Sequence, residues 1–134
     1  MAIASPPNLA ALLRLDVDAP RGARHHVCQV DSPSPDLRDA VVLLTSEIVT
    51  RAVRQSRSAE EAVELRVWMP PEVVRVELRG PNARLFQPHP GGASHYEHTL
   101  LEQIADRWSV EEDPEDPGIW FEIDRHGCGT SQRR

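Results

Sequence analysis

The sequence predicts an α+β two-layer sandwich, in which helices cover one face of a mixed or antiparallel sheet. Two observations indicate this class. Residues 36–56 and 94–108 carry apolar side chains at the spacing of one face of a helix. Residues 63–78 and 108–124 alternate apolar and polar side chains on both sides of a turn, which is typical of paired strands. We expect the helices to be segregated from an antiparallel sheet, as this class requires.

The composition limits the classes of function. The net charge of -6 argues against a general nucleic-acid binder, which needs a basic surface. We find no signal peptide, and the longest apolar run, AVVLL, is too short to span a membrane, so a cytoplasmic protein is expected. Cys28 and Cys128 lie far apart, and the six His residues have no convergent partners, so no metal site is expected.

The chain of 134 residues is long enough for one domain with one core. We expect residues 9–125 to form this domain. Residues 1–8 are small and Pro-containing and are expected to be disordered, and residues 126–134 are expected to form a flexible tail.

The first elements are a strand and a helix. Residues 9–17 end in an alternation that predicts a strand with one covered face. Asp18 is the expected N-cap of the helix that follows, because Pro20 suits a first turn. The inner side of that helix is expected to carry Ala23, Val27 and Val30.

The helix over residues 36–56 is the element around which the chain is organised. Ser34 is its expected N-cap. Its apolar side is expected to carry Leu37, Val41, Val42, Leu44, Ile48, Val49, Ala52 and Val53. Glu47, Arg51 and Arg54 fall on the opposite, exposed side, and the spacing of Glu47 and Arg51 favours a surface salt bridge.

The rest of the sheet is expected to come from two hairpins. The first turns at Pro70-Pro71 and the second at the acidic segment 112–118. Between them, residues 80–94 have no periodicity and are expected to form a long loop. Ser94 and Glu97 then have the spacing of a capping box at the start of the second helix.

Four short stretches resemble one protein family. SEIVTRAV, which begins at Ser46, resembles the N-box helix S-E-L-V-T-N-A of the anti-sigma factor serine kinases, small bacterial members of the GHKL, or histidine-kinase-like, ATPase superfamily. ADRWSV resembles the family's A-D-R-W-G-V, GIWFEI its closing G-x-x-x-W-F-E-L strand, and GARHHV the A-R of its first helix. The order and spacing of these stretches are those of the family, which implies a Bergerat-type fold.

The resemblance also implies that the ATP and magnesium site is degenerate. Glu47 occupies the position of the family's general base, but Arg51 replaces the Asn that binds magnesium, and a guanidinium cannot ligate a cation. Gly80 replaces the Asp that accepts from the adenine amino group. Glu97 lies within the segment that replaces the family's phosphate-binding G-x-G-L turn. No catalytic or cofactor-binding residue is therefore assigned, and we expect no cofactor.

The resemblance implies a regulator in a partner-switching circuit. With the kinase lost, the main hypothesis is a nucleotide-independent anti-sigma-like protein that binds a sigma factor, a STAS-type anti-sigma antagonist, or both. Arg24 lies where the family's first helix supplies a partner-contacting Arg. A homodimer through the first strand and helix is also implied.

Three alternatives stay open. One is an active serine/threonine kinase that binds ATP in a divergent pocket, uses Glu47 as the base and phosphorylates the antagonist. Another is a nucleotide held by Arg51 and Arg54 without metal. The third is an unrelated small metabolite in the old pocket.

Overall fold

The computed structural model describes residues 5–29, 35–87 and 99–125. Five strands, three α-helices and one 3-10 helix lie within these ranges. In chain order they are β1 (Leu9–Arg14), α1 (Ala19–Cys28), α2 (Pro35–Gln55), β2 (Ala62–Trp68), β3 (Val73–Arg79), the 3-10 helix η1 (Ala83–Phe86), α4 (Thr99–Ile104), β4 (Arg107–Glu111) and β5 (Gly118–Asp124).

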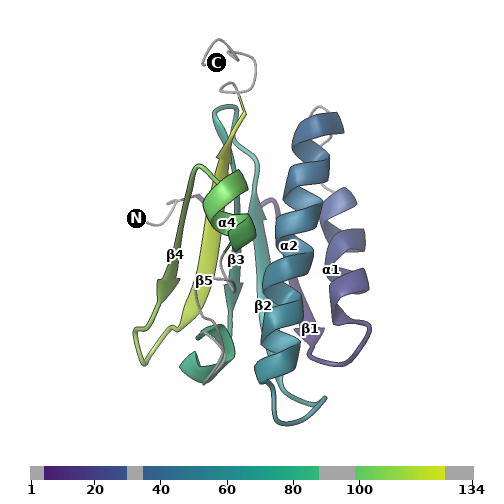
Figure 1. Cartoon of the computed structure of the whole chain (residues 1–134), viewed down its shortest axis with the longest axis vertical. Helices are drawn as coiled ribbons and strands as arrows, with labels where there is room; N and C mark the ends of the chain where they lie inside the picture. The colour runs from purple at the N-terminus through teal and green to yellow at the C-terminus, as the bar shows by residue number, and fades with distance from the viewer. Residues whose placement is uncertain (1–4, 30–34, 88–98, 126–134) are drawn as a thin grey trace.

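The strands form one antiparallel sheet in the order β1-β2-β3-β5-β4. The three α-helices lie on the same side of this sheet (Figure 1). The predicted α+β class is therefore confirmed, with one sheet face covered by helices and the other, which we call the outer face, facing away from them.

The core lies between the sheet and the helices. Alternate residues of the central strands point into it, and the apolar side of α2 packs onto them, as the helical spacing predicts. The most buried of these side chains, all at most 2 % exposed, include Val41, Leu44, Ile48, Val49, Leu65, Val67, Val76, Leu78, Ile119 and Phe121. Burial of this apolar layer is the main stabilising contribution to the fold.

The first strand is shorter than its pattern predicts. It ends at Arg14, and Val17 is 85 % exposed instead of covered. The chain turns at Asp16, whose carbonyl accepts from the N–H of Ala19 at 3.1 Å and whose side chain accepts from the N–H of Asp18 at 2.9 Å. Asp18 occupies the predicted N-cap position of α1 but makes no side-chain cap.

Residues 5–8 differ from the expected disordered N-terminus. The carbonyl of Ser5 accepts from Trp68 Nε1 at 2.8 Å. Asn8 donates its N–H to the carbonyl of Val67, and its side chain accepts from the N–H of Met69 at 2.7 Å. These bonds attach the residues that precede β1 to β2 and to Met69, which follows it.

The predicted loop after β3 contains a short helix. The side chain of Asn82 accepts from the N–H of Arg84 at 3.2 Å and begins η1. Predictions for Val30, Ser34, Ser94, Glu97 and the tail concern residues outside the described ranges. Within those ranges, no helix combines the length and apolar character needed to cross a membrane.

Candidate functional site

Arg51 does not lie on an exposed face of α2, contrary to the expectation from helical spacing. Its side chain is 4 % exposed, whereas Glu47 is half-buried and Arg54 is exposed. The helix α2 contacts α1, α4, η1 and the sheet, so much of its surface is covered. The exposed position expected from helical spacing is therefore wrong for Arg51.

Arg24, the predicted partner-binding residue, lies at the seam between α1 and α2. Its Nη1 donates to Ser46 Oγ at 3.1 Å, and its side chain is half-buried. Ser46 directly precedes Glu47 in α2. The structure thus brings Arg24 beside the segment of α2 that begins at Ser46, 22 positions further along the sequence.

Gly80 follows the last residue of β3 and faces the core. A Cβ at this position would lie 3.0 Å from Val63 Cγ1, 3.2 Å from Phe86 Cζ and 3.3 Å from Leu85 Cδ1. Leu85 and Phe86 come from η1 and are 1 % and 3 % exposed. The space beside Gly80 is therefore filled by apolar side chains.

Arg84 holds η1 against the end of α2. Its Nη1 donates to the carbonyl of Gln55, the last residue of α2, at 2.5 Å, and its Nη2 donates to Glu61 Oε2 at 2.8 Å. A cation at a helix C-terminus also interacts favourably with the helix dipole. The N–H of Arg57 and the Arg84 guanidinium both donate to Glu61 and hold the pKa of its carboxyl below the usual value. These bonds of Arg84 to Gln55 and Glu61, which we call the Arg84 clasp, hold Leu85 and Phe86 of η1 in place.

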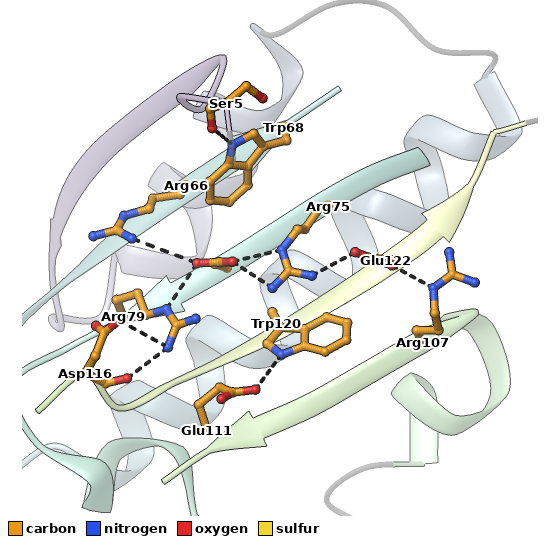
Figure 2. Close-up of polar contacts among 11 residues, drawn as sticks. Ser5, Arg66, Trp68, Arg75, Arg79, Arg107, Glu111, Asp116, Trp120 and Glu122 are labelled. Carbon is orange, nitrogen blue, oxygen red and sulfur yellow. Dashed lines mark hydrogen bonds and ion pairs between the residues drawn. The ribbon is translucent and has the colours of Figure 1, made fainter. Parts of the chain in front are cut away.

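The outer face of the sheet carries an ionic network that the sequence interpretation missed (Figure 2). Arg75 and Glu77 are each 2 % exposed, although no described helix covers them. Glu77 accepts from Arg75 at 2.8 Å and from Arg79 at 3.1 Å, and Arg66 lies 3.9 Å away. Three cationic side chains therefore lie around the Glu77 carboxylate.

The network continues onto β5 and β4. Glu122 accepts from Arg75 at 2.7 Å and from Arg107 at 2.6 Å, and Arg107 also pairs with Asp124. Burial alone would raise the pKa of the Glu122 carboxyl, but the bonds from Arg107 and Arg75 outweigh burial and lower it. The bonds to Asp124 and Glu122 likewise raise the pKa of Arg107. These groups remain charged at neutral pH.

Aromatic side chains complete this face. The guanidinium of Arg75 lies over the ring of Trp120, 4.2 Å from its centroid, in a cation–π contact. Trp120 Nε1 donates to Glu111 at 2.9 Å. Figure 2 shows Trp68 and Trp120 on either side of Arg75, so aromatic surface lies beside the ionic groups.

The sequence carries a signal for this network. Arg75, Glu77 and Arg79 alternate in charge along β3, and the register places Arg66 opposite Glu77 and Arg75 opposite Glu122. A strand pattern read together with the hairpin register predicts these opposite-charge pairs. It does not predict their burial, which depends on how the long side chains of four strands lie over one another.

Arg51 lacks the chemistry of the magnesium ligand that the resemblance implies for its position. The position that should supply a neutral oxygen ligand for magnesium holds the buried cation Arg51. Among the described side chains, no group of three His, Cys, Asp or Glu could hold a metal ion. Comparison with protein-family models and with curated proteins found no match.

Proposed function

We propose that this protein is a nucleotide-independent regulator of the anti-sigma type, with a degenerate Bergerat-type fold. It would bind a sigma factor or a STAS-type anti-sigma antagonist. The order of a strand, two helices, a hairpin, two short helices and a closing hairpin is consistent with that fold. The sequence resemblance in α1, α2, β4 and β5 supplies the family.

The observation that carries the proposal is the burial of Arg51 on α2. The resemblance requires an Asn at this position, whose side-chain oxygen would bind magnesium. An Arg has only donors and keeps its charge, so it repels a cation at close range. Because the side chain is 4 % exposed, it cannot turn into solvent without repacking the residues around α2.

The packing at Gly80 supports the same conclusion for the adenine. An Asp here would place its Cβ 3.0 Å from Val63 Cγ1 and 3.2 Å from Phe86 Cζ, so these side chains would have to shift by a few tenths of an ångström. The clasp of Arg84 with Gln55 and Glu61 keeps η1, and with it Phe86, in this place. Two independent changes, at Arg51 and at Gly80, thus remove the side chains that would bind the metal and the adenine.

A binding function needs a surface, and the seam of α1 and α2 offers one. Arg24 is held by Ser46 in a defined position, which lowers the entropic cost of using it in an interface. Arg is also among the residue types that contribute most to protein interfaces. We expect Arg24 to contact the partner.

Isothermal titration calorimetry with ATP and ADP, with and without magnesium, tests the loss of the nucleotide site. We expect no binding to the wild-type chain at millimolar nucleotide. Arg51→Asn removes the buried charge and restores the magnesium-ligand type, whereas Arg54→Asn makes the same change at an exposed position of α2 and serves as the matched control. Magnesium-dependent binding by the wild type would contradict the proposal and favour the kinase, which Glu47→Gln should then inactivate in a phosphotransfer assay.

The partner is sought by co-expression of this chain with each sigma factor and STAS-domain antagonist of its host. We expect a stable complex without added nucleotide. Arg24→Ala should weaken that complex at least tenfold, because interface Arg residues often contribute more than about 1.4 kcal/mol. Arg21→Ala, at an exposed position of α1, is the matched control. Equal affinity of the Arg24 and Arg21 variants would remove Arg24 from the interface.

A further inference from the structure

The strand β1 forms an open edge of the sheet. It pairs with β2 on one side, and in the part of the chain that the structure describes no strand lies on its other side. The N–H of Leu15 donates to the carbonyl of Glu61, so the odd-numbered residues of this antiparallel ladder bond to β2. The N–H groups of Ala10, Leu12 and Arg14 therefore point away from β2, as do the carbonyls of Ala10 and Leu12.

The side chains at this edge leave it accessible. Ala10, Leu12 and Arg14 are all exposed, and Leu12 is exposed to 73 %. Val17, in the turn after β1, is 85 % exposed, so the two most exposed large apolar side chains of the described residues lie at this end. Natural edge strands are commonly protected by Pro or by charged side chains, and residues 9–13 contain neither. Both the backbone and apolar side chains of β1 can therefore be reached by another chain.

Helix α1 provides a wall above this edge. It packs on β1 at the end of the two layers opposite β4 (Figure 1). Arg24 bonds to Ser46 on the side of α1 that meets α2, and Gly22 lies about 160° away around the helix, toward the open edge. Among the described atoms, a Cβ at Gly22 would meet only Leu13 Cδ2, at 3.9 Å. The space beside Gly22 is thus open to an apolar side chain of a strand added next to β1.

The charge at this end of the molecule identifies the kind of strand that fits. Residues 9–29 contain three Arg and two Asp, whereas the whole chain has a net charge of -6. Arg14 is the exposed last residue of β1, and β1 contains no acidic residue. A second copy of β1 paired with this edge would therefore supply no counter-charge for Arg14. An acidic side chain on a strand from another protein would supply it, since opposite charges on paired strands attract.

The strand β4 at the other edge lacks these features. Of its residues only Arg107 is exposed, and Arg107 already bonds to Glu122 and pairs with Asp124. Residues 111–116, which lead out of β4, are acidic at five of six positions. An acidic strand would be repelled there and attracted to β1.

We propose that the open edge of β1 binds an extended acidic segment of another protein, which adds to the sheet as a further strand. Alternate residues of this segment are acidic, on the outer face beside Arg14, and apolar, on the helix side beside Gly22. Main-chain hydrogen bonds to Ala10 and Leu12 supply affinity, and the alternating side chains supply specificity. This site is separate from Arg24, so it goes beyond the proposed function and does not depend on it.

A synthetic heptapeptide, Thr-Val-Glu-Val-Glu-Val-Thr with both ends capped, is the probe. It is titrated to millimolar concentration into the isotope-labelled full chain and followed by NMR. We expect chemical-shift changes in β1 and slower hydrogen exchange at the amides of Ala10, Leu12 and Arg14. The amides of Ala11 and Leu13 should gain no protection, because they already bond to β2. The same peptide with both Glu nitrogens methylated cannot donate to the edge and should not bind.

Two variants test the backbone and the charge separately. Ala10→Pro removes an outward N–H without removing a bond to β2, and it should weaken peptide binding roughly tenfold. A peptide with Lys in place of both Glu should bind more weakly than the acidic peptide, and Arg14→Glu should reverse that preference. Arg54→Glu, at an exposed position of α2, is the matched control and should leave the preference unchanged.

Circular dichroism should show that all three variants are folded. The proposal would be overturned if β1 showed no shifts at millimolar peptide, or if the methylated peptide bound as well as the unmethylated one. Protection of the Ala10 and Leu12 amides that rises with protein concentration in the absence of peptide would also overturn it, since a second copy would then occupy the edge. None of these results would alter the nucleotide titration that tests the proposed function.

Discussion

Glu77→Gln should be among the most destabilising single substitutions on the outer face. The carboxylate is 2 % exposed and bonds to Arg75 and Arg79 at 2.8 and 3.1 Å. Removal of its charge leaves the equally buried Arg75 with only Glu122 as an ionic partner. Breaking a buried ion pair from one side costs about 3–5 kcal/mol, and the lower value applies here because Arg75 retains that second partner. We therefore expect a loss of about 3 kcal/mol in the free energy of unfolding.

Urea denaturation followed by circular dichroism measures this loss, and the midpoint of thermal unfolding should fall by roughly 10 °C. Glu64→Gln is the control, because Glu64 is 40 % exposed and its ion pair is with Arg66. An exposed pair contributes less than about 1 kcal/mol. If the two variants lost the same free energy, the outer face would be screened by solvent and the reasoning from burial would be refuted.

Three further predictions follow from other contacts. Gly118→Ala should lower the free energy of unfolding by about 2 kcal/mol, because the new Cβ would lie 2.6 Å from the carbonyl oxygen of Leu78 in β3. Gly22→Ala in α1 is the control, because a Cβ has room there and the change should be neutral or stabilising. The midpoints of urea denaturation compare the two variants. Arg84→Ala should lower the free energy of unfolding by about 1–2 kcal/mol, because it removes the hydrogen bonds to Gln55 and Glu61. It should also increase hydrogen exchange at the end of α2, and unchanged exchange there would show that Arg84 does not hold η1 against α2. The pKa values of Glu61 and Glu122 lie below the ordinary 4.5, so both carboxylates add stability that is complete above that value and is lost as the pH falls through their folded-state pKa. Glu61→Gln should therefore lose less stability than the wild type on acidification below pH 4.5, and an identical pH profile would exclude Glu61 as a contributor.

The regular elements of this fold are largely predictable from the sequence, because their signals are periodic. The apolar spacing within residues 36–56 locates α2 to within one residue at each end. The alternation in the two hairpins likewise gives β2, β3, β4 and β5. These patterns depend on which face of an element meets the core, and that is a local property of the chain.

Properties set by tertiary packing are not predictable in the same way. η1 has only four residues and depends on the Asn82 side chain and on bonds from Arg84 to other segments. Helical spacing places Arg51 on the polar side of α2, yet it is 4 % exposed in a helix that contacts α1, α4, η1 and the sheet. Val17 follows the alternation of a strand but lies in a turn fixed by Asp16.

One part of the candidate site is likewise predictable from the sequence, and another part is not. The family resemblance assigns Arg51 and Gly80 to the magnesium and adenine positions, and their residue types make them poor ligands there. The contacts that fill the space beside Gly80 require the structure, because Phe86 comes from a segment without periodicity. The outer-face network combines both kinds of information, since its charges are visible in the strands and its burial is not.

The central claim is that this chain binds its partner without nucleotide. The most direct test measures the dissociation constant of the complex with the co-purified sigma factor or antagonist by calorimetry, in the absence and in the presence of millimolar magnesium-ATP. The account predicts the same dissociation constant in both conditions and no phosphate on the partner by mass spectrometry. A tenfold or larger change in affinity with magnesium-ATP, or a phosphorylated antagonist, would contradict it.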